Sequence, residues 1–183
     1  MSPRPGSRRS LRRSVILFLA IVLLGTIVTG TTHAGFVAGD EPEWADQILV
    51  EKSARRLTLL AQGVPIRSYA IALGASPIGP KQREGDERTP EGDYVIDARN
   101  EKSEFHLSLR ISYPNEQDRA RAAEAGVDPG GDIMIHGIRN GLGWIGSFHT
   151  RVDWTNGCIA VTDGEIEDIW ALVKIGTPVR ITP

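Results

Sequence analysis

The sequence predicts a mainly β fold, a sandwich or closed barrel with one or two short helices, and three patterns lead to this class. From Ile48 onward, short runs rich in β-branched residues alternate with turns rich in glycine and proline. The first runs are joined by turns of only a few residues, which antiparallel neighbours permit. A clear helical period occurs once, close to the C-terminus. These patterns indicate the fold class but do not name a family.

Each expected strand is a short apolar run between turn residues. In chain order, the expected strands are ILVEK (48–52), RRLTLLA (55–61), VPIRSYAIALG (64–74), YVIDAR (94–99), FHLSLRISY (105–113), DIMIHG (132–137) and TPVRI (177–181). The polar stretch 75–93 is rich in glycine and proline, so we expect a surface loop there.

Two helices are expected between these strands. The first spans residues 115–126, with Asn115 as its cap and Gly126 as its stop. The second begins at a capping box formed by Thr162 and Glu165 and is expected to end at Gly176. Four apolar residues at helical spacing form its inner face: Ile166, Ile169, Trp170 and Val173.

The first 34 residues differ in composition from the rest of the chain. They contain five arginines and no acidic residue. Their apolar run, residues 15–28, is shorter than the roughly 20 residues of a membrane-spanning helix. This order is typical of a signal peptide cleaved after Ala34, and an uncleaved N-terminal membrane anchor is the alternative. Residues 35–45 are expected to be a linker, and residues 46–183 the functional domain.

The charge of the exported part excludes one class of partner. Without the first 34 residues, 16 basic residues stand against 23 acidic ones, which gives a formal charge of about −7. Nucleic-acid-binding proteins carry a basic surface, so no nucleic-acid partner is expected.

The chain has one cysteine, Cys158, within the stretch DWTNGCIAVTD (residues 153–163). A lone thiol in an exported protein pairs with another molecule or is reactive. Free cysteines are also often small buried hydrophobic residues. Here Gly157 allows close approach of a substrate, and Asn156 and Gly157 form a polar turn whose N–H groups can face an oxyanion. This context favours a nucleophile.

A nucleophilic thiol needs a histidine within hydrogen-bond reach. His136 follows an apolar run and precedes Gly137, which predicts a position at the end of a buried strand. His149 lies in a loop nine residues before the cysteine, and His106 lies inside an expected strand. A core histidine and a solvated loop residue are the alternatives for His136 and His149. No short histidine or cysteine pair is present, so no metal or cofactor is expected.

Three motifs occur in the order found in the YkuD-type L,D-transpeptidases, and the domain resembles that family. The motifs are RTPEGDY (88–94), DIMIHG (132–137) and TNGCIAV (155–161). The likeness covers residues 46–183, and the stretches GPK, ISYPN and DWTNGCIA are similar to the YafK-like branch. The resemblance implies that residues 46–183 form a catalytic domain with a YkuD-like β-sandwich or barrel fold. It implies no cofactor.

Position by position, the resemblance implies roles for the residues around the thiol. Cys158 matches the nucleophile and His136 the base that activates it. Thr155 and Gly157 match the turn around the thiol, and the Cys158 N–H matches an oxyanion donor.

Two departures from the family pattern are visible. The position two residues before the cysteine is a histidine in most relatives and Asn156 here, and the interval from His136 to Cys158 is longer, at 22 positions. The longer segment allows His149 to act in place of the missing histidine. Gly137 and His106 are further candidates for substrate contact.

The resemblance also implies a reaction. The thiol would form a thioester at meso-diaminopimelate of a peptidoglycan stem peptide and pass the acyl group to an amine of another stem peptide or of a wall-anchored protein. Water as the acceptor would make the protein an L,D-hydrolase. A sortase-like enzyme is disfavoured because no arginine closely follows Cys158, and a non-catalytic wall-binding domain is disfavoured by the intact histidine, glycine and cysteine set. The expected location is the periplasm or cell envelope, with the inner membrane as the site of any anchor.

Overall fold

The computed structural model describes residues 44–183. The expected signal peptide or membrane anchor and nearly all of the expected linker lie outside the described residues. Within residues 44–183 there are eight strands, two α-helices and one 3-10 segment. None of the helices in this part of the chain has the length and apolar character needed to cross a membrane.

All eight described strands belong to one mixed sheet in the order β3-β2-β1-β8-β4-β5-β6-β7. The pairs β1–β8 and β6–β7 are parallel, and all other neighbours are antiparallel. The strand bounds are β1 Gln47–Glu51, β2 Arg56–Ala61, β3 Val64–Ala70, β4 Gly92–Ser103, β5 His106–Ile111, β6 Met134–His136, β7 Ile159–Ala160 and β8 Pro178–Thr182.

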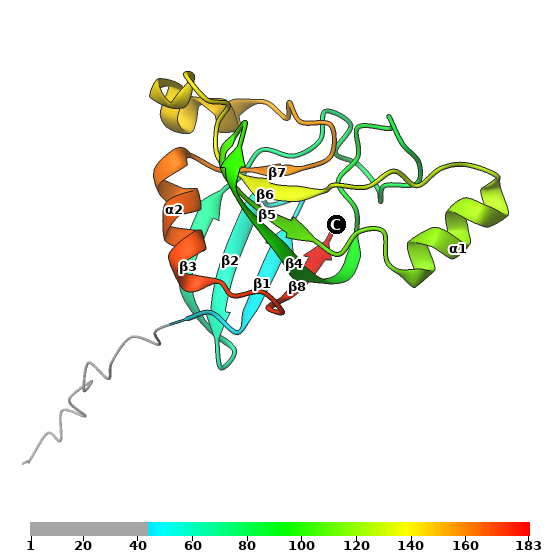
Figure 1. The fold of residues 1–183 in the computed structure, drawn as a ribbon, viewed down its shortest axis with the longest axis horizontal. Helices are drawn as coiled ribbons and strands as arrows, with labels where there is room; N and C mark the ends of the chain where they lie inside the picture. Colours follow the sequence, from blue (N-terminus) through cyan, green and yellow to red (C-terminus); the bar gives the residue numbers. More distant parts are fainter. Residues whose placement is uncertain (1–43) are drawn as a thin grey trace, which may run out of the picture. The chain divides into compact units, whose positions relative to one another are not determined.

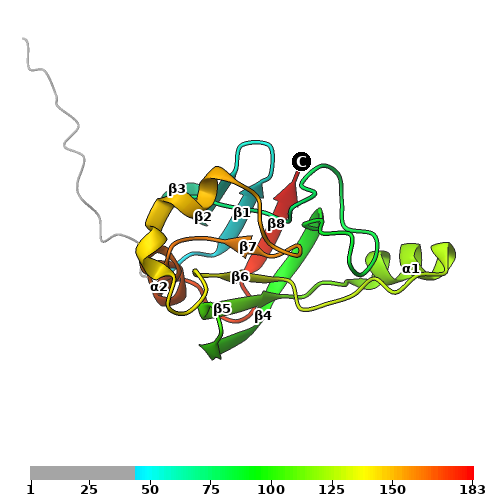
Figure 2. The ribbon, with the colours of Figure 1, turned by 90° about the horizontal axis from the view of Figure 1, so that it is seen from above.

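The sheet curls over on itself, so that β1, β2 and β8 lie across from β5, β6 and β7 (Figures 1 and 2). Directly after β3, the backbone of Ala72 both donates to and accepts from Ala160 in β7, at 2.9 Å each. The Leu73 carbonyl accepts from the N–H groups of Trp154 and Thr155, at 3.1 Å each. These contacts join the segment after β3 to the other end of the sheet, and the predicted mainly β class is confirmed.

The expected strands are present, with shifted ends. The antiparallel pairing of β1, β2 and β3 confirms the predicted meander. β4 is longer than predicted, at 12 residues, because it continues into a hairpin with β5. β3 ends at Ala70, and the apolar residues after it pair only through single bridges. β7 is missing from the sequence prediction because its two residues are too few for any periodic pattern.

Three of the four predicted helix ends are confirmed. In α1 (Glu116–Ala125), Asn115 accepts from the Asp118 N–H and Gly126 takes the left-handed conformation. Figure 1 shows α1 standing away from the sheet. α2 (Asp163–Leu172) begins at the Thr162 capping box, but the prediction that it ends at Gly176 is wrong. It ends at Leu172 because Val173 already has extended backbone angles.

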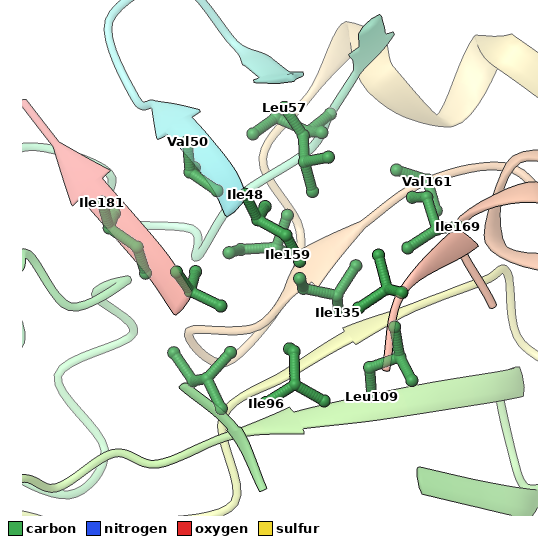
Figure 3. Packing of buried hydrophobic residues seen from close by; sticks show 14 of the residues in the cluster. Ile48, Val50, Leu57, Ile96, Leu109, Ile135, Ile159, Val161, Ile169 and Ile181 are labelled. Carbon is green, nitrogen blue, oxygen red and sulfur yellow. The ribbon is translucent and has the colours of Figure 1, made fainter. Parts of the chain in front are cut away.

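Alternate residues of the central strands fill the core. Leu109, Ile135 and Ile159 come from β5, β6 and β7, and all three are fully buried (Figure 3). Ile166 and Ile169 pack onto them from α2. Successive residues of a strand point to opposite faces, so the neighbours of these three residues point away from the core. That outer face carries the candidate site.

Candidate active site

The parallel pairing of β6 with β7 brings His136 and Cys158 to one face of the sheet. His136 is in register with Ala160, and Cys158 precedes that position by two residues, so both side chains point to the same side. His136 ends β6 and Cys158 directly precedes the neighbouring strand β7, and neighbouring strands lie about 4.8 Å apart. The core residues Ile135 and Ile159 hold this register.

The Cys158 thiol is half-buried among backbone groups. Its Sγ–H faces the Asp132 carbonyl at 3.7 Å, and the Met134 backbone donates a hydrogen bond to the sulfur. Burial raises the pKa of the thiol above its ordinary value of 9.0, while the bond from Met134 and the nearby Lys81 ammonium oppose the rise. The thiol is therefore neutral at neutral pH and needs a base to become a nucleophile.

His136 is buried and held in one tautomer. Its Nδ1–H donates to the Gly137 carbonyl at 2.7 Å, so Nε2 carries the lone pair. The rings of Phe105 and Trp154 flank the imidazole, with centroids 4.6 Å and 5.8 Å away. Burial lowers the pKa of His136 below its ordinary value of 6.5. A neutral imidazole with a free Nε2 is the form required of a general base.

The turn before the cysteine is held by the Thr155 side chain. Its hydroxyl accepts from the Gly157 N–H at 3.1 Å and donates to the Cys158 carbonyl at 2.7 Å. Gly157 has φ +126°, and a Cβ there would lie 2.7 Å from the Arg88 carbonyl. Only glycine fits this position, which fixes the direction of the following thiol.

The two aspartates near the site do not orient His136, because the Gly137 carbonyl does so. Asp153 instead ties the turn to the sheet: it pairs with Arg55 at 2.6 Å and accepts from the Leu73 N–H at 2.9 Å. Asp132 has an 80% exposed side chain that lies 3.9 Å from the Arg110 guanidinium. Asp153 therefore supports the surrounding backbone, whereas Asp132 makes a long contact at the surface.

Cys158 and His136 line one cavity of about 830 Å³. Ser108 and Met134, on the same sheet face, form the rest of this wall. The opposite wall comes from the 3-10 segment η1 (Gly143–Arg151) and the residue just after it. Four residues supply most of that wall: Ile145, Phe148, His149 and Val152.

Several other residues singled out in the sequence meet at this cavity. Thr155 and Asn156 line it next to Cys158, and His149 lines it from η1 with only 7% of its surface exposed. Trp154 also lines it, and its indole N–H donates to His149 Nδ1 at 3.4 Å. Trp144 is not among the lining residues and is 82% exposed.

Two predicted candidates lie elsewhere. His106 is at the turn between β4 and β5, and its Nε2 lies 2.7 Å from a Glu167 carboxylate oxygen on α2. Gly137 lies behind the cavity, where a Cβ would be 2.8 Å from the Asp163 carboxylate and 3.1 Å from the Phe105 carbonyl. Its place is set by close packing between β6 and α2.

Sequence reasoning missed the part of the cavity wall that comes from β5 and its preceding turn. Ser108 is paired in register with His136, and Phe105 packs on the imidazole ring. The register between two antiparallel strands cannot be predicted from the local sequence of either strand. The only available signal was the alternation within FHLSLRISY, which places Ser108 opposite the core residues Leu107 and Leu109.

The described residues do not suggest a metal site. Among residues 44–183, no group of three or more histidine, cysteine or acidic side chains is arranged to hold a metal ion.

Comparison with known proteins identifies the family. Residues 45–181 match the YkuD family, described as the L,D-transpeptidase catalytic domain, so the chain belongs to that family. The chain is 32% identical over 108 residues to "Putative L,D-transpeptidase YafK" of Escherichia coli (strain K12), a match that covers 58% of this chain and 36% of that protein. The chain thus spans about a third of the length of this relative.

Solved structures share the fold. The helical cell shape determining protein Pgp2 from Campylobacter jejuni superposes with a TM-score of 0.57 at 24% identity, covering 78% of this chain and 51% of that one. Bd1075 from Bdellovibrio bacteriovorus superposes with a TM-score of 0.52 at 23% identity, covering 76% and 48%. At these identities the likeness is one of fold.

Proposed function

We propose that the protein is a peptidoglycan L,D-transpeptidase with Cys158 as nucleophile and His136 as general base. One observation carries this proposal: the two side chains share a sheet face and a cavity, and His136 has its Nδ1–H bonded to the Gly137 carbonyl. The remaining Nε2 lone pair is free to take the proton of a neutral thiol. Membership of the L,D-transpeptidase family supports the choice of a stem peptide as substrate.

The first half-reaction forms a thioester. His136 Nε2 takes the thiol proton while Sγ attacks the carbonyl carbon at the L-centre of meso-diaminopimelate. The Cys158 N–H and the side chain of Asn156, which lines the cavity, would stabilise the oxyanion, whereas the Gly157 N–H is already bonded to Thr155. When the tetrahedral intermediate collapses, the C–N bond breaks and the imidazolium returns its proton to the leaving D-amino acid.

The second half-reaction decides which product forms. An amine of another stem peptide or of a wall-anchored protein attacks the thioester, gives a proton to His136 Nε2, and displaces the Cys158 thiolate, which is then protonated. Water in place of the amine releases the free acid and makes the protein an L,D-hydrolase. The same residues serve both outcomes, so the acceptor that reaches the thioester first decides between them.

We also propose that this reaction takes place in the periplasm or cell envelope. The composition of residues 1–34 supports export, through a cleaved signal peptide or an N-terminal anchor in the inner membrane. A change in wall cross-links alters cell shape, a property that the description of the neighbour Pgp2 names for that protein.

Incubation with tetrapeptide muropeptides tests the proposal. We expect release of D-alanine, with dimers or exchanged D-amino acids when transfer dominates and tripeptides when hydrolysis dominates. Mass spectrometry of the products separates these outcomes. Intact muropeptides after incubation with the wild-type domain, under conditions in which its Cys158 thiol titrates as free, would rule out both activities.

A further inference from the structure

Two buried polar side-chain atoms in the described part of the chain have no hydrogen-bond partner there: His149 Nε2 and Ser108 Oγ. Both residues line the cavity that holds Cys158 and His136. Buried polar atoms in folded proteins are almost always hydrogen-bonded. Neither atom has appreciable accessible surface, so a ligand in this cavity would supply the missing hydrogen-bond partner after a side-chain movement.

The hydrogen bond to Trp154 determines what His149 can offer. The Trp154 indole nitrogen is a donor only, and it donates to His149 Nδ1 at 3.4 Å. Nδ1 thus holds the lone pair and Nε2 holds the proton. Burial lowers the pKa of His149, against the opposing effect of the Glu165 and Asp163 carboxylates, so the ring is neutral at neutral pH. Its Nε2 presents an N–H group.

The two histidines of the cavity are consequently in opposite tautomers. His136 has its proton on Nδ1 and a lone pair on Nε2, whereas His149 has the reverse arrangement. A general base needs a lone pair directed at the reacting proton, and only His136 provides it. The unpartnered atom of His149 has a complementary use, as a donor toward an acceptor on the substrate.

We propose that His149 is a substrate-binding residue whose Nε2–H donates to a peptide oxygen, either a carboxylate or a peptide carbonyl. This inference rests on the proposed function and extends it, because it assigns a recognition role to the η1 wall. That wall is otherwise apolar, formed by Ile145, Phe148 and Val152, and a hydrogen bond made among apolar groups is well suited to fix a ligand's orientation. Arg139 is the one arginine or lysine among the lining residues and supplies a positive charge suited to a carboxylate.

The test compares His149→Leu, which removes the donor, with His149→Gln, whose amide N–H occupies the Nε2 position. With a soluble tetrapeptide muropeptide, we expect His149→Leu to raise KM about tenfold, as for other unmade hydrogen bonds to substrate, while His149→Gln stays within about threefold of wild type. Alkylation of Cys158 by iodoacetamide needs no peptide recognition, so its rate should stay within about twofold of wild type in both variants. Thermal unfolding confirms that both are folded.

A C-terminally amidated tetrapeptide identifies the oxygen. If His149 binds the terminal carboxylate, amidation should raise KM no further in His149→Leu, because both changes remove the same hydrogen bond. If His149 binds a peptide carbonyl, the two fold-increases in KM should multiply. A wild-type KM in a folded His149→Leu protein would overturn the inference, as would slowed alkylation, which would indicate a role in thiol activation. Equal losses in the Leu and Gln variants would overturn it as well. A wild-type protein that turns over no muropeptide would instead remove the proposed function, and this inference with it.

Discussion

The two walls of the cavity are built differently. The sheet wall holds Cys158 and His136 on strands whose alternate residues are locked in the core, and backbone carbonyls fix both side chains. The η1 wall is a 3-10 segment kinked at Gly146, with Phe148 and Val152 each 63% exposed. We propose that the sheet wall carries the chemistry and that the apolar η1 wall binds the substrate.

The largest effect is expected for removal of the nucleophile. Cys158→Ala should lower turnover of tetrapeptide muropeptides by about 10⁴-fold or more, because the variant lacks the thiol that is proposed to carry the acyl intermediate. The half-buried side chain is small, so the fold should persist. D-Alanine release by the variant at a rate near wild type would show that the thiol is not the nucleophile.

Loss of the base should have the next largest effect. His136→Gln should lower kcat/KM by about 10²- to 10⁴-fold, the range for a positioned acid–base group. In the wild type, the neutral imidazole is the active form and burial lowers its pKa, so kcat/KM should fall with decreasing pH only below 6.5. A pH–rate profile checks this sign; an acid limb at or above pH 6.5 would contradict the buried neutral histidine.

The turn that directs the thiol should tolerate no side chain. Gly157→Ala must place a Cβ 2.7 Å from the Arg88 carbonyl at φ +126°. We expect kcat/KM to fall about tenfold to a hundredfold, because a small displacement of a reacting group is costly. Gly63→Ala is the matched control: it also has positive φ, +76°, but no atom within 4 Å of its Cβ. Equal kcat/KM in the two variants would show that the conformation of this turn does not determine activity.

The smallest effect is expected at the outer side of the η1 wall. Trp144 is 82% exposed and does not line the cavity, so Trp144→Ala should change KM less than about twofold and stability by about 0.5 kcal/mol or less. Phe148→Ala, which does remove part of the lining, should raise KM more. Equal KM increases in the two variants would mean that recognition extends beyond the cavity.

The two residues proposed for the chemistry were easier to single out from the sequence than the cavity around them. Cys158 and His136 lie in short motifs with local signals, which are a glycine turn and a strand end. Such signals can be recognised without knowledge of the fold. The positions of Ser108 and Phe105 depend on the β5–β6 register, which joins residues about 28 apart in the chain. The burial of His149 depends on its contact with Trp154, which no periodic pattern in a loop could indicate.

The strand predictions show the same limit. Runs of five or more residues with clear alternation were found, whereas β7, with two residues, has meaning only through its pairs with β6 and with Ala72. This shortest strand is also the one that carries Cys158 to its place beside His136. Strand pairing, rather than local propensity, therefore determines where Cys158 lies.

Acylation of Cys158 tests the central claim most directly. The wild-type domain is mixed with a tetrapeptide muropeptide and quenched in acid after short times, and its intact mass is measured before peptide mapping. We predict a thioester adduct with the mass of the donor tripeptide acyl group, located on Cys158, formed much more slowly in His136→Gln and absent in Cys158→Ala. D-Alanine release without any adduct in the wild type, or an adduct located on another residue, would contradict the account.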